Sequence, residues 1–399
     1  MLAPSPKSNK NYKLTDSCWG IEEFQSLQKV IESENFTMGN KVKEFESKFA
    51  KYHGKNHGIM VNSGSSANLL SIASLFFKKK NPLKKGDEVI VPALSWSTSY
   101  FPLQQYGLKC KFIDINIDTL NVDFEVLKKS ITEKTKLILA VNILGNPCEL
   151  HKIKQICNEK KIYLFQDNCE SLDAEIKGKK AGTFGDVSSF SFFYSHHINT
   201  MEGGMILTDS KEIANLCYSM RSHGWTRNLI DISKKRRKNI IELYDFIYPG
   251  YNIRPLEFSA ACGLEQIKKL PKMTQIRRKN LKFFNQIFCD DPRFMIQKEI
   301  GNSSSFSFPI ILKKKYKLYR EKLFRALTNS GIEFRMVAGG CFTRHKVYKF
   351  FDSPTVPPSL VNANYVHDNG FCVGNYAKDL STSLKYLKHI LDNVITIKK

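Results

Sequence analysis

Short apolar segments alternate with segments of helical length between residues 88 and 208 of this chain. Because the short segments are rich in β-branched and aromatic residues, they are predicted to be strands. They cover residues 88–91, 111–115, 137–141, 162–166, 188–193 and 205–208. Apolar strands that are separated by helical crossovers form parallel sheets with helices on both faces. The sequence therefore predicts an α/β fold with a mostly parallel sheet.

A change of pattern near Pro271 divides the chain. Beyond it, two basic helical stretches flank a strand-like segment at residues 306–312, and a further helix is expected near the C-terminus. A single hydrophobic core stops growing at roughly 250–300 residues, whereas this chain has 399. We expect a large domain over residues 1–270, with a helical N-terminal segment, and a smaller α+β domain over residues 271–399.

The net charge limits the classes of partner. The chain has 61 Lys and Arg against 38 Asp and Glu, a formal charge of +23. Such a balance favours an anionic partner, which could be nucleic acid, a membrane surface or a phosphorylated substrate. The basic residues are scattered without a basic–aromatic repeat, and the densest run, at residues 234–238, is typical of a solvated loop. We expect no nucleic-acid partner.

Neither a membrane nor a metal is indicated by the sequence. The longest apolar stretch is too short to cross a bilayer, and the N-terminus lacks a secretory pattern. The ten cysteines form no CxxC or CxC pair, and the nine histidines form no HExxH pattern, so zinc and iron–sulfur signatures are missing. We expect a cytoplasmic protein with reduced thiols, without a metal and without a membrane partner.

Two polar motifs lie where an α/β sheet binds ligands. Gly64, Ser65 and Ser66 begin the apolar stretch 67–77, and such a helix start can hold a phosphate, although a simple serine cap is the alternative. Asp167 follows a predicted strand at its carboxyl end, where open sheets bind ligands. A helix cap is an equally good interpretation of Asp167.

A third motif is the segment SFFYSHHINTMEGG at residues 191–204, which links two predicted strands. It contains the adjacent histidines His196 and His197 and ends in a diglycine. A single histidine is more often structural than functional, and two neighbours in one loop favour a functional site only modestly.

In this order, the motifs resemble the DegT/DnrJ/EryC1/StrS sugar aminotransferases, which are fold-type-I pyridoxal-phosphate (PLP) proteins that act on nucleotide-linked keto-sugars. The resemblance runs almost from end to end. It is carried by FTMG at 36–39, NSGSS at 62–66, VPALSW at 91–96, QDNCE at 166–170, the segment at 191–204, and GYNIRPLE at 250–257. It implies the fold-type-I PLP-dependent transferase fold.

One position departs from the aminotransferases of that family. They hold the cofactor covalently through a lysine eight residues before the last glycine of the EGG motif, and that position here is His196. An imidazole cannot bind the cofactor covalently, so ordinary transamination loses its transaldimination step and its usual proton carrier. It can still accept and deliver a proton near neutral pH.

This departure is typical of the histidine-containing branch of nucleotide-sugar 3-dehydratases. The surrounding HHxxTxEGG, FTMG, DNC and GYNxRPLE patterns resemble the type that acts on GDP-4-keto-6-deoxymannose. The resemblance implies that glutamate converts PLP to its amine form, pyridoxamine phosphate (PMP), and that the carbon-3 hydroxyl of the sugar is removed. Relatives acting on CDP-linked hexuloses carry an iron–sulfur cluster on clustered cysteines, which are lacking here.

The resemblance also implies roles for individual residues and a homodimer with shared active sites. His196 is the catalytic base. The cofactor-binding residues are Gly64, Ser65, Ser66, Trp96, Asp167, Glu170, Ser191 and, from the neighbouring subunit, Asn252. The substrate-binding residues are His223, Arg227 and Arg254, whose cationic groups suit a nucleotide diphosphate.

Three alternatives to this assignment stay open. A nucleotide-sugar 4-aminotransferase could use another lysine, although no lysine lies between Lys180 and Lys211. A CDP-linked hexulose 3-dehydratase would share the histidine. A basic binding protein without catalytic activity is the third, and the retained cofactor residues argue against it.

Overall fold

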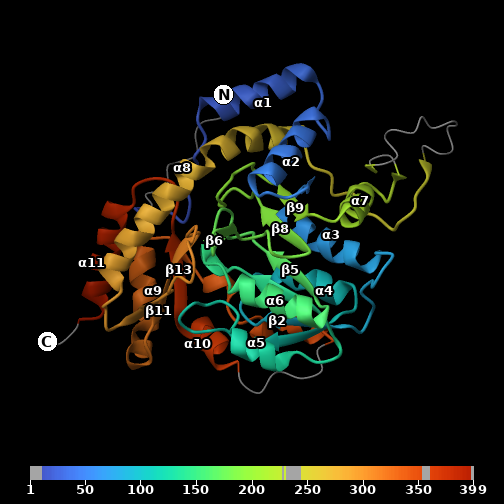
Figure 1. Ribbon diagram of the computed structural model, residues 1–399. Helices are drawn as coiled ribbons and strands as arrows, with labels where there is room; N and C mark the ends of the chain where they lie inside the picture. Colours follow the sequence, from blue (N-terminus) through green and yellow to red (C-terminus); the bar gives the residue numbers. More distant parts are fainter. Residues whose placement is uncertain (1–10, 227–228, 231–243, 353–359, 397–399) are drawn as a thin grey trace.

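The computed structural model describes residues 11–226, 229–230, 244–352 and 360–396 (Figure 1). A seven-stranded sheet forms its centre, in the strand order β1-β9-β8-β5-β4-β2-β3. The strands are β1 (His57–Val61), β2 (Glu88–Pro92), β3 (Lys109–Ile113), β4 (Thr135–Val141), β5 (Tyr163–Asp167), β8 (Val187–Ser191) and β9 (Gly204–Thr208). All pairs from β3 to β8 are parallel, and β9 alone runs in the opposite direction.

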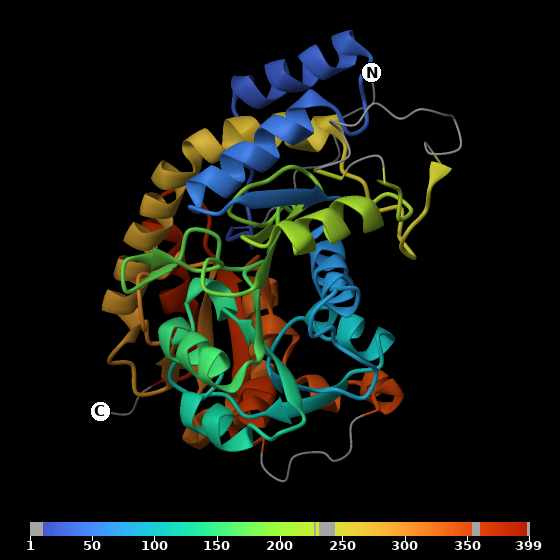
Figure 2. The same cartoon turned by 45° about the vertical axis from the view of Figure 1, so that its right-hand side comes forward.

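Helices cover both faces of this sheet (Figures 1 and 2). They are α2 (Asn40–Tyr52), α3 (Gly64–Phe76), α4 (Phe101–Gln105), α5 (Phe124–Ser130), α6 (Leu150–Lys160) and α7 (Lys211–Met220). The strands are buried almost throughout, because helices exclude water from each face. The predicted α/β fold with a mostly parallel sheet is confirmed, and each of the six predicted strands is present.

A second sheet lies in the C-terminal part of the chain. Its order is β10-β11-β13-β12, and all its pairs are antiparallel. The elements are β10 (Phe294–Ile296), β11 (Ser307–Leu312), α9 (Arg320–Asn329), β12 (Phe334–Arg335), α10 (Val361–Asn369), β13 (Gly370–Gly374) and α11 (Ser381–Val394). This sheet packs with α9 and α11 around its own apolar core. A short hairpin of β6 (Glu175–Ile176) and β7 (Lys179–Lys180) completes the strands of the described residues.

Helix α8 (Glu257–Phe288) joins the two parts and crosses the predicted boundary at residue 270 (Figure 2). Its first half packs with α1 (Ile21–Ser33) and α2, where Leu264 and Ile267 join the core beneath the large sheet. Its second half supplies Phe284 and Phe288 to the C-terminal core. The division into domains at residue 270 stays a prediction.

None of the described helices combines the length and the apolar character that a bilayer crossing needs. The basic run at 234–238 lies outside the described residues.

Candidate active site

A cavity of about 350 Å³ lies at the carboxyl ends of the central strands. The ends of β4, β5 and β8 contribute Val141, Asp167 and Ser191, and the turn between β1 and α3 contributes Gly64 and Ser65. The C-terminal part closes the cavity from the other side with residues of β11, β12 and β13. Ligands of α/β sheets bind at this edge.

The turn at the start of α3 is built to hold an anion. Ser63 caps the helix, because its Oγ accepts a hydrogen bond from the backbone N–H of Ser66 at 3.1 Å. A Cβ on Gly64 would lie 2.5 Å from the Cβ of Ser191, and a Cβ on Gly204 would overlap the carbonyl oxygen of Ser63. Only glycines let the turn, β8 and β9 approach this closely. The result is a small cup at a helix N-terminus that faces the cavity.

Asp167 is fixed as an acceptor at the floor of the cavity. Its Oδ2 accepts hydrogen bonds from Asn68 Nδ2 at 2.9 Å and from Ser99 Oγ at 2.7 Å, and its Oδ1 accepts one from the N–H of Cys169 at 3.0 Å. Only 4% of Asp167 is exposed. No α-helix begins between Asp167 and β6, a stretch that is described throughout, so the helix-cap interpretation fails. A carboxylate held in this way can keep a ring nitrogen protonated.

Trp96 also lines the cavity, and 56% of it is exposed. Because a tryptophan of the hydrophobic core would be buried, this exposure favours a ring that covers a ligand. Gly339, from the C-terminal part, lies against the same indole, and a Cβ there would lie 3.7 Å from it.

The two adjacent histidines face different surroundings. His196 lines the cavity beside the ring of Phe306, with ring centroids 5.0 Å apart, and its Nδ1 has no hydrogen-bond partner among the described residues. His197 is buried, does not line the cavity, and places Nε2 3.1 Å from the carbonyl oxygen of Ser304. Burial, helped by Arg277, lowers the pKa of His196 to about 3, so its imidazole is neutral at neutral pH.

Glu170 is a second titratable group in the cavity. Its Oε2 accepts a hydrogen bond from the N–H of Leu144 at 2.9 Å. Burial raises the pKa of Glu170 to about 7, so near neutral pH the carboxyl group can either donate or accept a proton.

Several lining residues were not predicted from the sequence. Arg335 of β12 brings a guanidinium group to the cavity, and Ser195 and Glu202 come from the same loop as His196. The sequence carried a signal for the latter two, because both lie inside the motif at 191–204. Arg335 has no such signal, since its strand is only two residues long.

Other predicted residues lie elsewhere. Ser66 is used in the cap of α3 and does not line the cavity. Three of the predicted residues lie outside the cavity, namely His223, Asn252 and Arg254. Asn252 forms an antiparallel β-bridge with Ser222, next to His223, and accepts a hydrogen bond from Arg254 Nε at 3.0 Å. Arg227 lies outside the described residues.

The cavity fits the cofactor that the sequence resemblance implies. The cup at the start of α3 suits its phosphate, the buried carboxylate of Asp167 suits its ring nitrogen, and the exposed indole of Trp96 suits its ring face. The imidazole of His196, whose Nδ1 has no hydrogen-bond partner, is the group left to act on the bound molecule.

Comparison with known proteins gives the same assignment. The family model described as DegT/DnrJ/EryC1/StrS aminotransferase family matches residues 18–387. GDP-4-keto-6-deoxy-D-mannose 3-dehydratase of Yersinia pseudotuberculosis is 48% identical over 386 residues, which are 96% of this chain and 98% of that protein.

Two solved structures extend the likeness to three dimensions. GDP-4-keto-6-deoxy-D-mannose-3-dehydratase of E. coli with bound hydrated PLP has a TM-score of 0.93 at 48% identity, over 96% of this chain and 99% of the other. GDP-4-keto-6-deoxymannose-3-dehydratase with a trapped PLP-glutamate geminal diamine has a TM-score of 0.92 at 48% identity, over 95% and 100%.

Proposed function

The chain belongs to the DegT/DnrJ/EryC1/StrS aminotransferase family, and we propose that it is a PLP-dependent dehydratase that removes the carbon-3 hydroxyl of GDP-4-keto-6-deoxymannose. Glutamate is the amino donor that returns the cofactor to its amine form, PMP. The observation that carries the proposal is His196, which occupies the expected lysine position and faces the cavity. No lysine is among the cavity-lining residues in the described part of the chain, which counts against an aminotransferase.

The residues that hold the cofactor follow from their chemistry. Ser65 and Ser191 hold the phosphate with the N–H groups at the start of α3, Asp167 holds the proton on the ring nitrogen, and Trp96 covers the ring. When bound, PLP supplies an electron sink and, in its amine form, the nitrogen that joins the sugar's carbonyl carbon.

His196 moves the proton in this proposal. Its Nε2 accepts a proton from the bound molecule, and the resulting imidazolium returns a proton to the departing hydroxyl group. The surroundings of the ring keep it neutral before it accepts that proton. Phe306 packs against it and excludes water from that side.

Arg335 is the cation that binds glutamate in this proposal. It is the arginine that reaches the cavity from the C-terminal sheet, and a guanidinium group suits the carboxylate of glutamate. Glu170 lines the same cavity, where its proton can be shared with a hydroxyl group of the bound molecule.

A homodimer with shared active sites is part of the proposal. Asn252 and Arg254 lie outside their own chain's cavity, so a second subunit is where they would act. The outer face of α1 exposes Ile21, Phe24 and Ile31 at 65%, 58% and 58%, an apolar surface that favours a protein contact. The ten free cysteines favour the reducing cytoplasm as its location.

The test is an assay of the purified protein with PLP, glutamate and GDP-, CDP- or dTDP-linked 4-keto-6-deoxyhexoses. We expect release of ammonia and a 3-deoxy sugar from the GDP-linked substrate. A stable amino-sugar nucleotide would instead identify an aminotransferase, and a protein that binds no PLP would refute the enzymatic assignment.

A further inference from the structure

The loop between β8 and β9 carries His196 and is closed at its base. Phe192 donates a hydrogen bond from its N–H to the carbonyl oxygen of Gly203 and accepts one from the N–H of Thr200, both at 2.9 Å. His197 ties one flank of the loop to Ser304 of the C-terminal part. Nδ1 of His196 has no hydrogen-bond partner, and the backbone group that hydrogen-bonds to its ring, that of Phe193, belongs to the same loop. The orientation of the imidazole therefore depends on where this loop is held.

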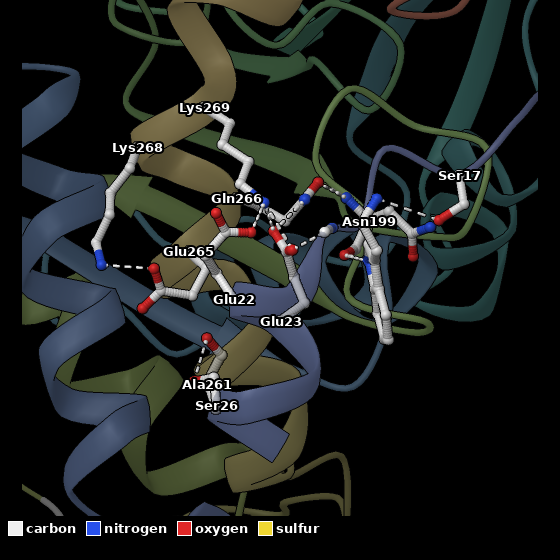
Figure 3. Close-up of polar contacts among 12 residues, drawn as sticks. Ser17, Glu22, Glu23, Ser26, Asn199, Ala261, Glu265, Gln266, Lys268 and Lys269 are labelled. Carbon is white, nitrogen blue, oxygen red and sulfur yellow. Dashed lines mark hydrogen bonds and ion pairs between the residues drawn. The ribbon is translucent and has the colours of Figure 1, made fainter. Parts of the chain in front are cut away.

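Asn199, three residues after His196, is a second point at which the loop is held. Its carbonyl oxygen accepts a hydrogen bond from Trp19 Nε1 at 3.0 Å, and its N–H donates to Gln266 Oε1 at 3.3 Å (Figure 3). Its side chain serves the loop itself, since Oδ1 accepts from the N–H of Met201 at 2.9 Å. The contacts to Trp19 and Gln266 therefore attach the backbone of the loop to elements outside it.

Gln266 on α8 is held in one orientation by a buried acid. Its Nε2 donates to Glu23 Oε1 at 2.7 Å, and Glu23 on α1 also accepts from Lys269 Nζ and from the N–H of Gly20, each at 2.7 Å (Figure 3). Both Glu23 and Gln266 are fully buried. A carboxylate can only accept hydrogen bonds, so it fixes the amide nitrogen on its own side and the amide oxygen toward Asn199.

We propose that Gln266, oriented by Glu23, and Trp19 are positioning residues for His196: they hold the β8–β9 loop where the imidazole faces the cavity. This inference rests on the proposed function for the role of His196. Helix α1 contributes no residue to the cavity. Through Glu23 it nevertheless helps to set the position of the imidazole of His196.

The variants that test it are Gln266→Met and Trp19→Phe. Methionine keeps the length of Gln266 but loses both amide contacts, and phenylalanine keeps a ring against Phe24 but loses the indole N–H. Ser26→Ala is the matched control. It removes a hydrogen bond of the same α1–α8 interface, Ser26 Oγ to the carbonyl oxygen of Ala261, which does not reach the loop (Figure 3).

Two measurements are made on the full-length protein with PLP. In hydrogen exchange read by mass spectrometry, we expect faster exchange of residues 192–203 in Gln266→Met and Trp19→Phe, and wild-type exchange in Ser26→Ala. In the dehydration assay we expect kcat to fall by about 10-fold or more with KM changed by less than about 2-fold, because the base is misplaced while binding is retained.

The outcomes separate this inference from the proposed function. The inference is overturned if the loop exchanges at the wild-type rate in both variants, whether or not kcat falls. It is also overturned if the loop exchanges faster while kcat stays at the wild-type value. If the wild-type protein does not dehydrate the sugar, the proposed function fails, and loop exchange alone still decides whether these residues hold the loop. If Gln266→Met does not fold, Trp19→Phe carries the test.

Discussion

Replacing Asp167 by asparagine separates its structural role from its proposed chemical role. The carboxylate accepts three hydrogen bonds, two on Oδ2 and one on Oδ1. An asparagine has one acceptor oxygen and one NH₂ group, which is a donor. In one orientation the NH₂ group faces the donors Asn68 and Ser99, and in the other it faces the N–H of Cys169. In each orientation at least one buried donor has no acceptor, which costs about 1–3 kcal/mol.

We therefore expect Asp167→Asn to lower the free energy of unfolding of the cofactor-free protein by about 1–3 kcal/mol, measured by urea denaturation. Asp118→Asn is the control, because Asp118 is exposed and its carboxylate pairs with no described residue other than Lys298, a contact worth about 0–1 kcal/mol. With PLP bound, we expect kcat of Asp167→Asn to fall by about 100-fold or more, since an amide cannot hold the ring nitrogen's proton. If Asp167→Asn keeps kcat within about 2-fold, the reasoning about this carboxylate is refuted.

Three further predictions test other parts of the site. His196→Asn should lower kcat by about 100-fold or more. Because the ring of His197 meets Ser304 outside the cavity and holds only the loop, His197→Asn should lower kcat by only about 10-fold; the reverse order would show that the wrong histidine was assigned. Burial raises the pKa of Glu170 to about 7, above its unfolded value, so the free energy of unfolding of the wild-type protein should fall as pH rises from about 4.5 to about 7. In urea denaturation, Glu170→Gln should lose less stability over that range. If the two proteins show the same pH dependence, the raised pKa is contradicted. Mixing Asp167→Asn with Asn252→Ala should restore part of the wild-type activity through hybrid dimers, whereas an active monomer in sedimentation would exclude shared sites.

Site residues are predicted best from the sequence where they lie at the end of a recognisable strand. Asp167 and Ser191 end strands of the central sheet, so recognising the strands also locates the residues. Strand β1 was not predicted, because it begins with His57 and Gly58, which weaken an apolar pattern.

Arg335 was missed for a different reason. It lies on a two-residue strand whose position is set by pairing with β13, so tertiary packing, not local pattern, brings it to the cavity. Trp19 and Gln266 are likewise distant in sequence from the loop that they hold. Such contacts between distant segments leave no period or spacing in the sequence.

The central claim is that His196 stands where relatives hold the cofactor covalently, so that this chain binds PLP without a covalent bond. The most direct measurement is the intact mass of the protein after incubation with PLP and reduction with borohydride. We predict no added mass on the wild-type chain and one reduced cofactor attached at position 196 in His196→Lys, which should no longer dehydrate the sugar. A wild-type chain that retains the cofactor covalently after reduction would contradict the account.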